Sequence, residues 1–511
     1  MGAAHNPSPL RITTRRQTMR PTSRAAWALS PLLAGIALLP LTLSTAQAAG
    51  YRFGTQSAAA EGTANANGAE AADASTIFAN PAGILRLSKG WNFSGVLDYV
   101  DADLRFTDQG STISLPGSGL QPRAIGVVGE TSTAAKPVVV PHAYASYRAS
   151  DDIAYGIGVF VPWGTKINYP SNWGGRYNIQ SVELQSLNIN PNVAFKVAKG
   201  LSVSAGFSLE YMDGKLRPAV PYGSVYAAGL LSAAHQAATA GAPGLALQLQ
   251  QQAAQVFGDP QYDGSIGVKG SDWGVGLNFS ALWEISADTR VGVAYRSPIQ
   301  HKLRGNADWT QPSTLPANVL AAITASPYNG TSAMDHNDSA ASLAVRTPES
   351  LSIHGFHQLT PTIAIMGDFT WTNESRLKQL RIDFKNTTAD SIIAEHWKDS
   401  TKLSIGAQWK ATDRLLLRTG VTKDRSPVPS STRSPALPDS ARTWFAVGGN
   451  WAFDLNTSVD LSLGHVKLKD AAMNATDDGD GEHVCNCSFA TARGNYNTKA
   501  TIFGVQLNHK F

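Results

Sequence analysis

The 511-residue chain has little charge, almost no cysteine and no long uninterrupted apolar run. With only 2 Cys and 16% charged residues, neither a disulfide framework nor a coiled coil fits the composition. The only long charge-free apolar stretch near the start, residues 25–49, is interrupted by Pro31 and Pro40. A spanning helix needs roughly 20 continuous apolar residues. Because no later stretch approaches that length, the sequence excludes a helical membrane protein.

A net basic charge is also missing once the start of the chain is considered separately. Arg20 and Arg24 precede an apolar stretch that ends in small residues up to Ala48, which is typical of a secretory signal peptide cut after residue 48. Residues 1–18 add nothing apolar, so a start at Met19 would give an ordinary signal peptide; a membrane anchor is the alternative. The leader holds five Arg and no acidic residue, which leaves 37 of the 42 basic residues against 38 acidic ones. Nucleic-acid binding, which needs a clustered basic face, is therefore not expected.

From about residue 89 onward, apolar and polar residues alternate with period two, the pattern of strands with one apolar face. Val459, Leu461 and Leu463, for example, alternate with polar residues. Fourteen strands are predicted, at 90–107, 138–149, 152–163, 182–198, 201–216, 266–285, 289–304, 347–359, 361–384, 400–411, 413–423, 441–454, 456–469 and 495–511. Short turns and long loops alternate between them, as in an outer-membrane β-barrel with an even number of antiparallel strands. Several segments have fifteen or more residues, whereas the strands of a soluble β-sandwich, the alternative, usually have about five or six.

The segment before the first strand, residues 49–87, does not alternate and is rich in Ala, Gly, Asn and Ser. About forty residues are too few for a domain with its own core. The segment therefore either extends into the periplasm or folds inside the barrel. A fourteen-strand barrel is wider than the eight-strand size that side chains alone can fill, which leaves room for a plug.

Two loops, residues 216–265 and 305–346, are predicted to be helical and apolar. Residues 218–258 contain no Asp, Glu, Lys or Arg, and a helix would place four apolar residues near one face. These residues are Leu245, Leu249, Val256 and Phe257. The helices either cover one another and the barrel mouth, or form an outer apolar groove where a hydrophobic ligand lands.

Two polar features have two interpretations each. Cys485 and Cys487 lie in a polar stretch and form either a loop disulfide or exposed thiols. The acidic residues 477–482 form either a solvated loop or a Ca²⁺ site. No cofactor and no metal site is predicted from these patterns.

Four motifs follow one another in a recognisable order. They are Ala49-Gly50-Tyr51 with Asn80-Pro81-Ala82-Gly83, then Pro162-Trp163-Gly164, then Tyr169-Pro170-Ser171-Asn172-Trp173-Gly174-Gly175-Arg176-Tyr177, and finally Arg418-Thr419-Gly420 with Ser426-Pro427-Val428-Pro429, Leu437-Pro438-Asp439 and Arg442-Thr443-Trp444. In this order, on a fourteen-strand pattern, they resemble the FadL-type long-chain fatty-acid transporters of Gram-negative outer membranes. That family also includes channels for aromatic hydrocarbons.

The resemblance implies an all-β fold, a 14-stranded antiparallel transmembrane β-barrel over residues 88–511 with a hatch, residues 49–87, inside its lumen. It implies a non-enzymatic transporter of hydrophobic compounds, most of all long-chain fatty acids. The ligand would be captured at the outer loops, held in an internal pocket and released sideways at a kink in the third strand. The implied partners are the ligand, outer-membrane lipid and lipopolysaccharide, and the barrel-assembly machinery through the terminal Phe511.

Carried over by the same resemblance, the functional residues fall into four sets. The hatch or gate set is Tyr51, Phe53, Asn80, Pro81 and Ala82, and the lateral opening is Pro162, Trp163 and Gly164. The outer apolar groove is the set of four loop residues named above. The head-group set is Arg217 together with Arg381, or Lys378 in its place.

Two rival functions stay open beside the uptake of fatty acids or aromatic hydrocarbons. An outer-membrane hydrolase would need a Ser or Asp nucleophile beside a His base, and histidines on predicted strands are His142, His301, His354, His357 and His465. A general porin for polar solutes would instead conduct ions steadily through an open lumen.

Overall fold

The computed structural model describes residues 1–2, 52, 54–324, 337–386, 388, 390–477 and 488–511. The predicted leader, Tyr51, Phe53, both cysteines and residues 478–482 of the acidic run lie outside the described residues. Within the described part, no helix is long and apolar enough to cross a membrane.

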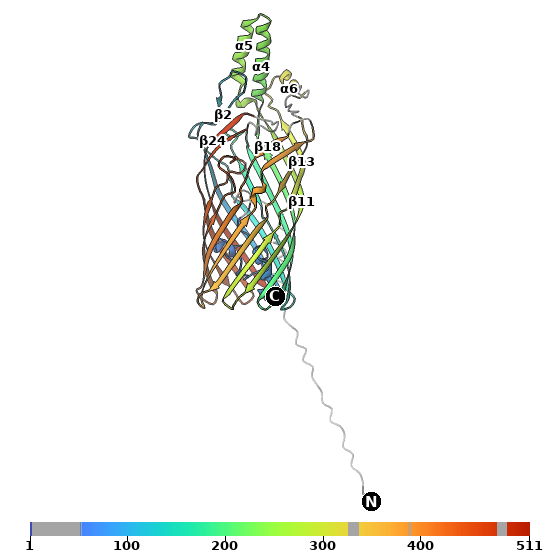
Figure 1. The fold of residues 1–511 in the computed structure, drawn as a ribbon, viewed down its shortest axis with the longest axis vertical. Helices are drawn as coiled ribbons and strands as arrows, with labels where there is room; N and C mark the ends of the chain where they lie inside the picture. Colours follow the sequence, from blue (N-terminus) through green and yellow to red (C-terminus); the bar gives the residue numbers. More distant parts are fainter. Residues whose placement is uncertain (3–51, 53, 325–336, 387, 389, 478–487) are drawn as a thin grey trace. The chain divides into compact units, whose positions relative to one another are not determined.

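The wall is one closed antiparallel β-barrel of fourteen strands, as the alternation predicts (Figure 1). Closure is made by the first and last strands, which pair from Asn92 opposite Lys510 to Asp108 opposite Gly494. In chain order the wall elements are β1 (Gly90–Asp108), β5 (Val138–Arg148), β6 (Ile153–Phe160) with β7 (Gly164–Asn168), β8 (Ser181–Ala198), β9 (Leu201–Arg217), β11 (Asp263–Glu284), β12 (Thr289–Arg296) with β13 (Gln300–Thr310), β14 (Ser339–Arg346) with β15 (Ser350–Gln358), β16 (Ile363–Thr372) with β17 (Gln379–Phe384), β18 (Ser391–Ala394) with β19 (Ser400–Lys410), β20 (Leu415–Asp424), β21 (Arg442–Ala452), β22 (Thr457–Leu468) with β23 (Ala471–Thr476), and β24 (Ala490–Lys510). Four short strands lie in the outer loops: β2 (Thr112–Ile113), β3 (Arg123–Ala124), β4 (Thr131–Thr133) and β10 (Ala219–Pro221).

Alternation along each strand puts apolar side chains outside and polar ones inside, as a membrane barrel requires. In β1, Leu97 and Tyr99 are exposed on the outside, whereas Ser94 and Asp98 are buried on the inside. Aromatic rings mark the outer limit of the apolar band, where Tyr211 lies opposite Trp273 with ring centroids 5.2 Å apart. Such rings occupy the interface between membrane and water.

Six wall strands are interrupted part-way, between β6 and β7, β12 and β13, β14 and β15, β16 and β17, β18 and β19, and β22 and β23. Pro162, Pro298 and Pro348 lie in three of these interruptions. Proline lacks the N–H that a ladder needs, so the sequence itself ends the pairing at these three points.

The N-terminal segment, residues 54–87, lies inside the barrel and packs against its strands (Figure 1). It contains α2 (Ala58–Gly62), α3 (Thr76–Ala79) and the 3₁₀ helix η1 (Pro81–Arg86). Its small residues allow close approach to the wall, since a Cβ built on Gly62 would lie 3.1 Å from the Cα of Gly448. An Ala- and Gly-rich composition therefore suits a segment enclosed by strands.

The outer loops carry a helical hairpin, α4 (Tyr222–Thr239) and α5 (Pro243–Val256), that projects beyond the strands (Figure 1). Its two helices pack through small apolar residues, among them Ala227, Leu230 and Ala253. Two 3₁₀ helices, η2 (Pro260–Tyr262) and η3 (Glu374–Arg376), and α6 (Ala317–Thr324) complete the helical elements in the described part.

Candidate functional site

The third wall strand has an unpaired edge. β5 and β6 pair only from Ala143 opposite Val159 to Arg148 opposite Ala154, and β7 pairs with β8 alone. Pro141 and Pro162 lie on the two strands that flank this gap, where a missing N–H is tolerated. The wall therefore lacks a β-ladder between its second and third strands above this point.

Side chains satisfy the backbone groups that the gap leaves without ladder partners. The N–H of Val161 donates to Nδ1 of His142 at 3.4 Å, and the carbonyl of Val161 accepts from Nε2 of Gln56 at 2.8 Å. The hydroxyl of Tyr144 donates to the Gln56 carbonyl at 3.0 Å, and Arg52 forms a backbone bridge with Trp163. The start of the N-terminal segment thus covers the gap from inside.

Two apolar cavities lie inside the upper barrel, on either side of Leu437 and Thr165, which line both. The first has a volume of about 70 Å³ and the second about 40 Å³. The first is lined by Leu184, Leu216, Leu303, Leu343, Leu377 and Leu437. A ligand that passed from one cavity to the other would have to displace Thr165 or the loop that carries Leu437.

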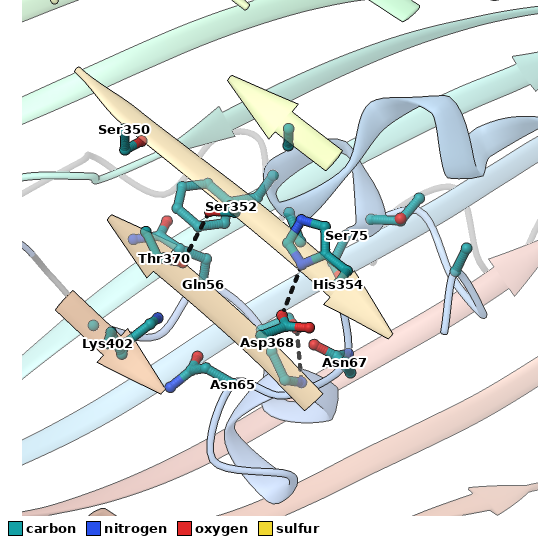
Figure 2. A pocket seen from close by; sticks show the side chains of 18 of the residues that line it. Gln56, Asn65, Asn67, Ser75, Ser350, Ser352, His354, Asp368, Thr370 and Lys402 are labelled. Carbon is teal, nitrogen blue, oxygen red and sulfur yellow. Dashed lines mark hydrogen bonds and ion pairs between the residues drawn. The ribbon is translucent and has the colours of Figure 1, made fainter. Parts of the chain in front are cut away.

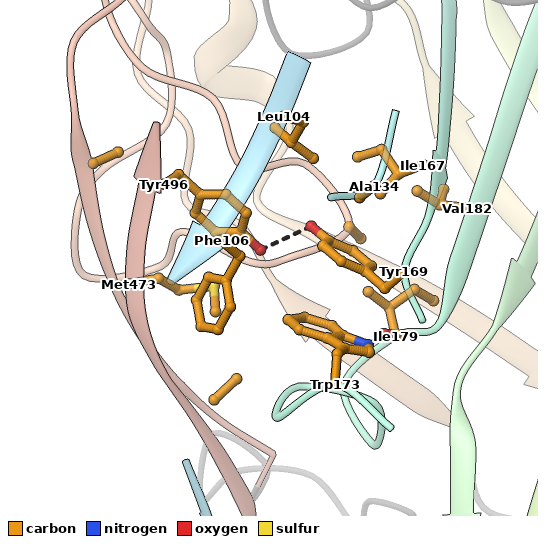
Figure 3. Packing of buried hydrophobic residues seen from close by; sticks show 13 residues of the cluster. Leu104, Phe106, Ala134, Ile167, Tyr169, Trp173, Ile179, Val182, Met473 and Tyr496 are labelled. Carbon is orange, nitrogen blue, oxygen red and sulfur yellow. Dashed lines mark hydrogen bonds between the residues drawn. The ribbon is translucent and has the colours of Figure 1, made fainter. Parts of the chain in front are cut away.

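Aromatic packing holds together the loop that carries Leu437 and the Tyr169–Tyr177 motif (Figure 3). The ring of Tyr169 stacks on Trp173 with centroids 3.8 Å apart. Its hydroxyl donates to the carbonyl of Pro435 at 3.0 Å and lies 2.8 Å from the hydroxyl of Tyr496. The motif therefore fixes the loop that separates the two apolar cavities.

A polar cavity of about 80 Å³ lies between the N-terminal segment and the wall. Figure 2 shows Lys402 on β19, Asp368 and Thr370 on β16, and His354 on β15 around it. Arg52 and Arg296 also line it. Burial lowers the pKa of Arg52, and the charges of Glu374 and Asp424 oppose this shift without cancelling it. The cavity thus collects cationic side chains whose desolvation is incompletely compensated.

Buried polar contacts hold the N-terminal segment to the wall. Glu70 pairs with Arg418 at 3.2 Å, and Arg418 also pairs with Asp460. Glu61 accepts from the Ser462 hydroxyl at 2.7 Å. Burial raises the pKa of Glu61 to about 8, and the nearby charge of Asp98 adds to the shift. Glu61 therefore carries a proton at neutral pH.

Comparison with known proteins decides the family. Residues 40–511 match the family described as outer membrane protein transport protein (OMPP1/FadL/TodX). The chain belongs to this family. An outer membrane protein of Neisseria meningitidis serogroup B is 32% identical over 92% of this chain and 96% of its own length, and the long-chain fatty acid transport protein of Salmonella typhi is 24% identical over 91% and 95%. A crystal structure of a Pseudomonas aeruginosa FadL homologue shares the fold, with a TM-score of 0.75 and 20% identity over 91% of this chain and 100% of its own.

Membership in the OMPP1/FadL/TodX family makes the chain a Gram-negative outer-membrane β-barrel that transports hydrophobic compounds. The family comprises transporters and channels rather than enzymes. The inward histidines are engaged with carboxylates, His301 with Glu210 at 3.1 Å and His354 with Asp368 at 3.0 Å.

The family-derived gate and opening residues lie where the N-terminal segment meets the wall. Pro81 and Ala82 begin η1, and Asn80 is its N-cap, whose side-chain amide donates to the Ala281 carbonyl at 3.0 Å. Pro162 and Trp163 occupy the interruption before β7, which begins at Gly164.

The structure does not bring the head-group set together. Arg217, Lys378 and Arg381 are all exposed and line neither apolar cavity. Arg217 bonds the Ser265 hydroxyl at 3.2 Å, and Arg381 pairs with Asp390. The cations that line the polar cavity in the lumen are Arg52, Arg296 and Lys402, and the sequence analysis does not single them out. Strand parity would have found two of them, because Arg296 and Lys402 fall on inward positions of β12 and β19.

The four groove residues of the outer loop do not lie together in the structure either. Val256 and Phe257 are buried in the cluster at the hairpin base, and Leu249 packs against that cluster. Leu245 is 51% exposed near the hairpin tip. They form no common exposed face, because the charge-free helices use their apolar residues to pack against each other.

Proposed function

We propose that this protein takes up long-chain fatty acids and releases them sideways into the outer membrane through the gap at the third strand. The observation that carries the proposal is the missing ladder above Ala143 and Val159, beside the apolar cluster of Val138, Val140 and Val161. An apolar chain that left through an aqueous lumen would lose its contacts with protein and gain none. A gap in the wall offers the bilayer interior instead.

The carboxylate of the ligand is held by the cations of the polar cavity, Arg52, Arg296 and Lys402. All three line one cavity, and Arg52 is bridged to Trp163 at the gap. A charge-assisted hydrogen bond to a carboxylate would compensate for their desolvation. This set replaces the exposed arginines as the head-group site and favours fatty acids over uncharged aromatic hydrocarbons, the alternative substrates.

The N-terminal segment, residues 49–87, acts as the hatch, and residues 88–511 form the barrel. Gln56 links the hatch to the gap through Val161, and Glu70 links it to Arg418. Capture begins at the outer apolar cluster of Trp309, Leu315 and the neighbouring loop residues, rather than along the hairpin.

Replacing the prolines that flank the gap tests the lateral route. The double variant Pro141→Val with Pro162→Val restores two N–H donors and lets the ladder extend. Oleate uptake by cells should fall while the barrel stays folded, as judged by heat modifiability. Pro298→Val is the matched control, because it restores a donor at another interrupted strand and should leave uptake unchanged. Unimpaired uptake in the double variant would indicate an axial route instead.

Lys402→Gln tests the substrate class. Loss of the cation should weaken oleate uptake and spare toluene uptake, since only oleate carries a carboxylate. Arg381→Gln removes an exposed cation outside the cavity and should spare both. An equal effect of Lys402→Gln on the two ligands would remove the cavity as a head-group site.

A further inference from the structure

A cationic concavity lies on the outer ends of five neighbouring wall elements, β7, β8, β9, β11 and β13. It has a volume of about 360 Å³. Its cationic lining residues are Lys136, Lys166, Lys215, Arg217 and Lys269. Glu183 and Asp308 are its only carboxylates among the described residues. The excess of basic over acidic side chains indicates an anionic occupant.

These cations face away from the lumen. Lys215 and Arg217 share strand parity with the exposed Phe207, and Lys269 shares parity with the exposed Trp273. Inward neighbours on the same strands, such as Leu216 and Val268, line both the concavity and the apolar cavity inside the barrel. Strand parity nevertheless directs the cationic side chains toward the membrane and its surface.

The height of the concavity follows from strand register. Tyr211 lies opposite Trp273, and four residues further out Lys215 lies opposite Lys269. At about 3.3 Å per residue and a tilt of about 45°, the lysines stand roughly 9 Å beyond the aromatic pair. Because aromatic rings mark the membrane interface, the lysines lie in the layer of lipid phosphates and sugars.

The charges of this patch are incompletely compensated by protein groups. Like charges directly opposite on neighbouring strands repel, as Lys215 and Lys269 do. Lys269 pairs with Asp308 at 3.1 Å, and Lys215 pairs with Asp213 at 3.6 Å. Glu183 is shared between Lys166 at 3.1 Å and Lys215 at 4.0 Å. In the described part of the chain, neither Lys136 nor Arg217 forms an ion pair with a carboxylate. An added anion between the strands would relieve the repulsion.

We propose that this concavity binds the phosphate groups of a phosphorylated glycolipid of the outer leaflet. Its acyl chains would lie along the exposed apolar wall below, where Phe207 and Val275 face the membrane, while its phosphates bind Lys215, Lys269 and Arg217. An amphiphile fits both features, whereas free phosphate uses only the cations. Arg217 thereby belongs to a lipid site on the outside of the barrel.

The test is native mass spectrometry of the refolded barrel with diphosphorylated lipid A or its dephosphorylated form. The barrel should retain the phosphorylated lipid and not the dephosphorylated one. Lys215→Gln with Lys269→Gln should weaken retention about thirty-fold, since each lysine near a charged lipid surface contributes about a factor of five. Inorganic phosphate should not displace the lipid.

A matched control exists on the far strands. Lys467 lies opposite Lys499, four residues beyond Leu463 and Phe503, and both lysines are exposed but line none of the described cavities. Lys467→Gln with Lys499→Gln should leave retention unchanged, with heat modifiability confirming that both variants fold. Equal retention of the two lipids, equal loss in the two variants, or displacement by inorganic phosphate would each overturn the proposal.

Discussion

Glu70→Gln perturbs the most buried ion pair between the N-terminal segment and the wall. Glu70 and Arg418 are 6% and 3% exposed at their side chains and lie 3.2 Å apart. Removing one partner of a buried pair costs about 3–5 kcal/mol when the other is left alone. Arg418 keeps its pair with Asp460. The loss of binding free energy between the segment and the wall should therefore be that of one hydrogen bond to a charged group, about 1.5–3 kcal/mol. A loss of about 2 kcal/mol raises the population of the released segment about thirty-fold.

Planar-bilayer recording measures this population directly, because release of the segment opens an aqueous path through the lumen. The Glu70→Gln barrel should show large-conductance openings about thirty times more often than the parent. Lys89→Gln is the control, since the Lys89–Asp151 pair is 63% and 64% exposed and such surface pairs contribute little. Equal opening frequencies in the two variants would refute the view that Glu70 holds the segment.

Three further perturbations follow from the same contacts. The pKa of Glu61 is raised from 4.5 to about 8, so its contribution to holding the segment is full below about pH 4.5 and is lost as the pH rises through about 8. Channel openings should therefore become more frequent over that pH range. Glu61→Gln should make the opening frequency nearly independent of pH. Leu437→Ala should lower barrel stability by about 2–5 kcal/mol, seen as a lower temperature of heat modification, and should speed uptake of bulkier ligands. Tyr169→Phe removes the two hydrogen bonds to Tyr496 and Pro435 and should cost about 1–3 kcal/mol, measured in the same melting assay.

The fold was readable from the sequence because each wall strand has two chemically different environments. Lipid on one side and a polar lumen on the other impose alternation on every strand, and the fourteen strands predicted from it are confirmed. Proline within a strand is an equally local signal, and Pro162 lies at the interruption before β7.

The lumen-facing site could not be predicted from the sequence in the same way, because it depends on which strands face one another across the barrel. Arg52, Arg296 and Lys402 line one cavity although they are more than a hundred residues apart along the chain at their closest. Arg217 and Arg381 attract notice as isolated cations, yet strand parity places them outside. The charge-free hairpin left two interpretations open in the sequence, because an apolar helical face fits equally well against a second helix and against a ligand.

For the proposed lateral route, the contacts at the gap predict that its closure and the attachment of the N-terminal segment form one equilibrium rather than two. Gln56 donates to Val161 at the gap and its own carbonyl accepts from Tyr144, and it lies two residues before α2, which packs on the wall. Withdrawal of the segment therefore removes the group that satisfies the Val161 carbonyl and uncovers the gap. A ligand can shift this equilibrium only by its difference in affinity for the two states. In the function proposed above, a carboxylate bound by Arg52 would supply such a difference, because Arg52 would move with the segment while Arg296 and Lys402 stay on the wall.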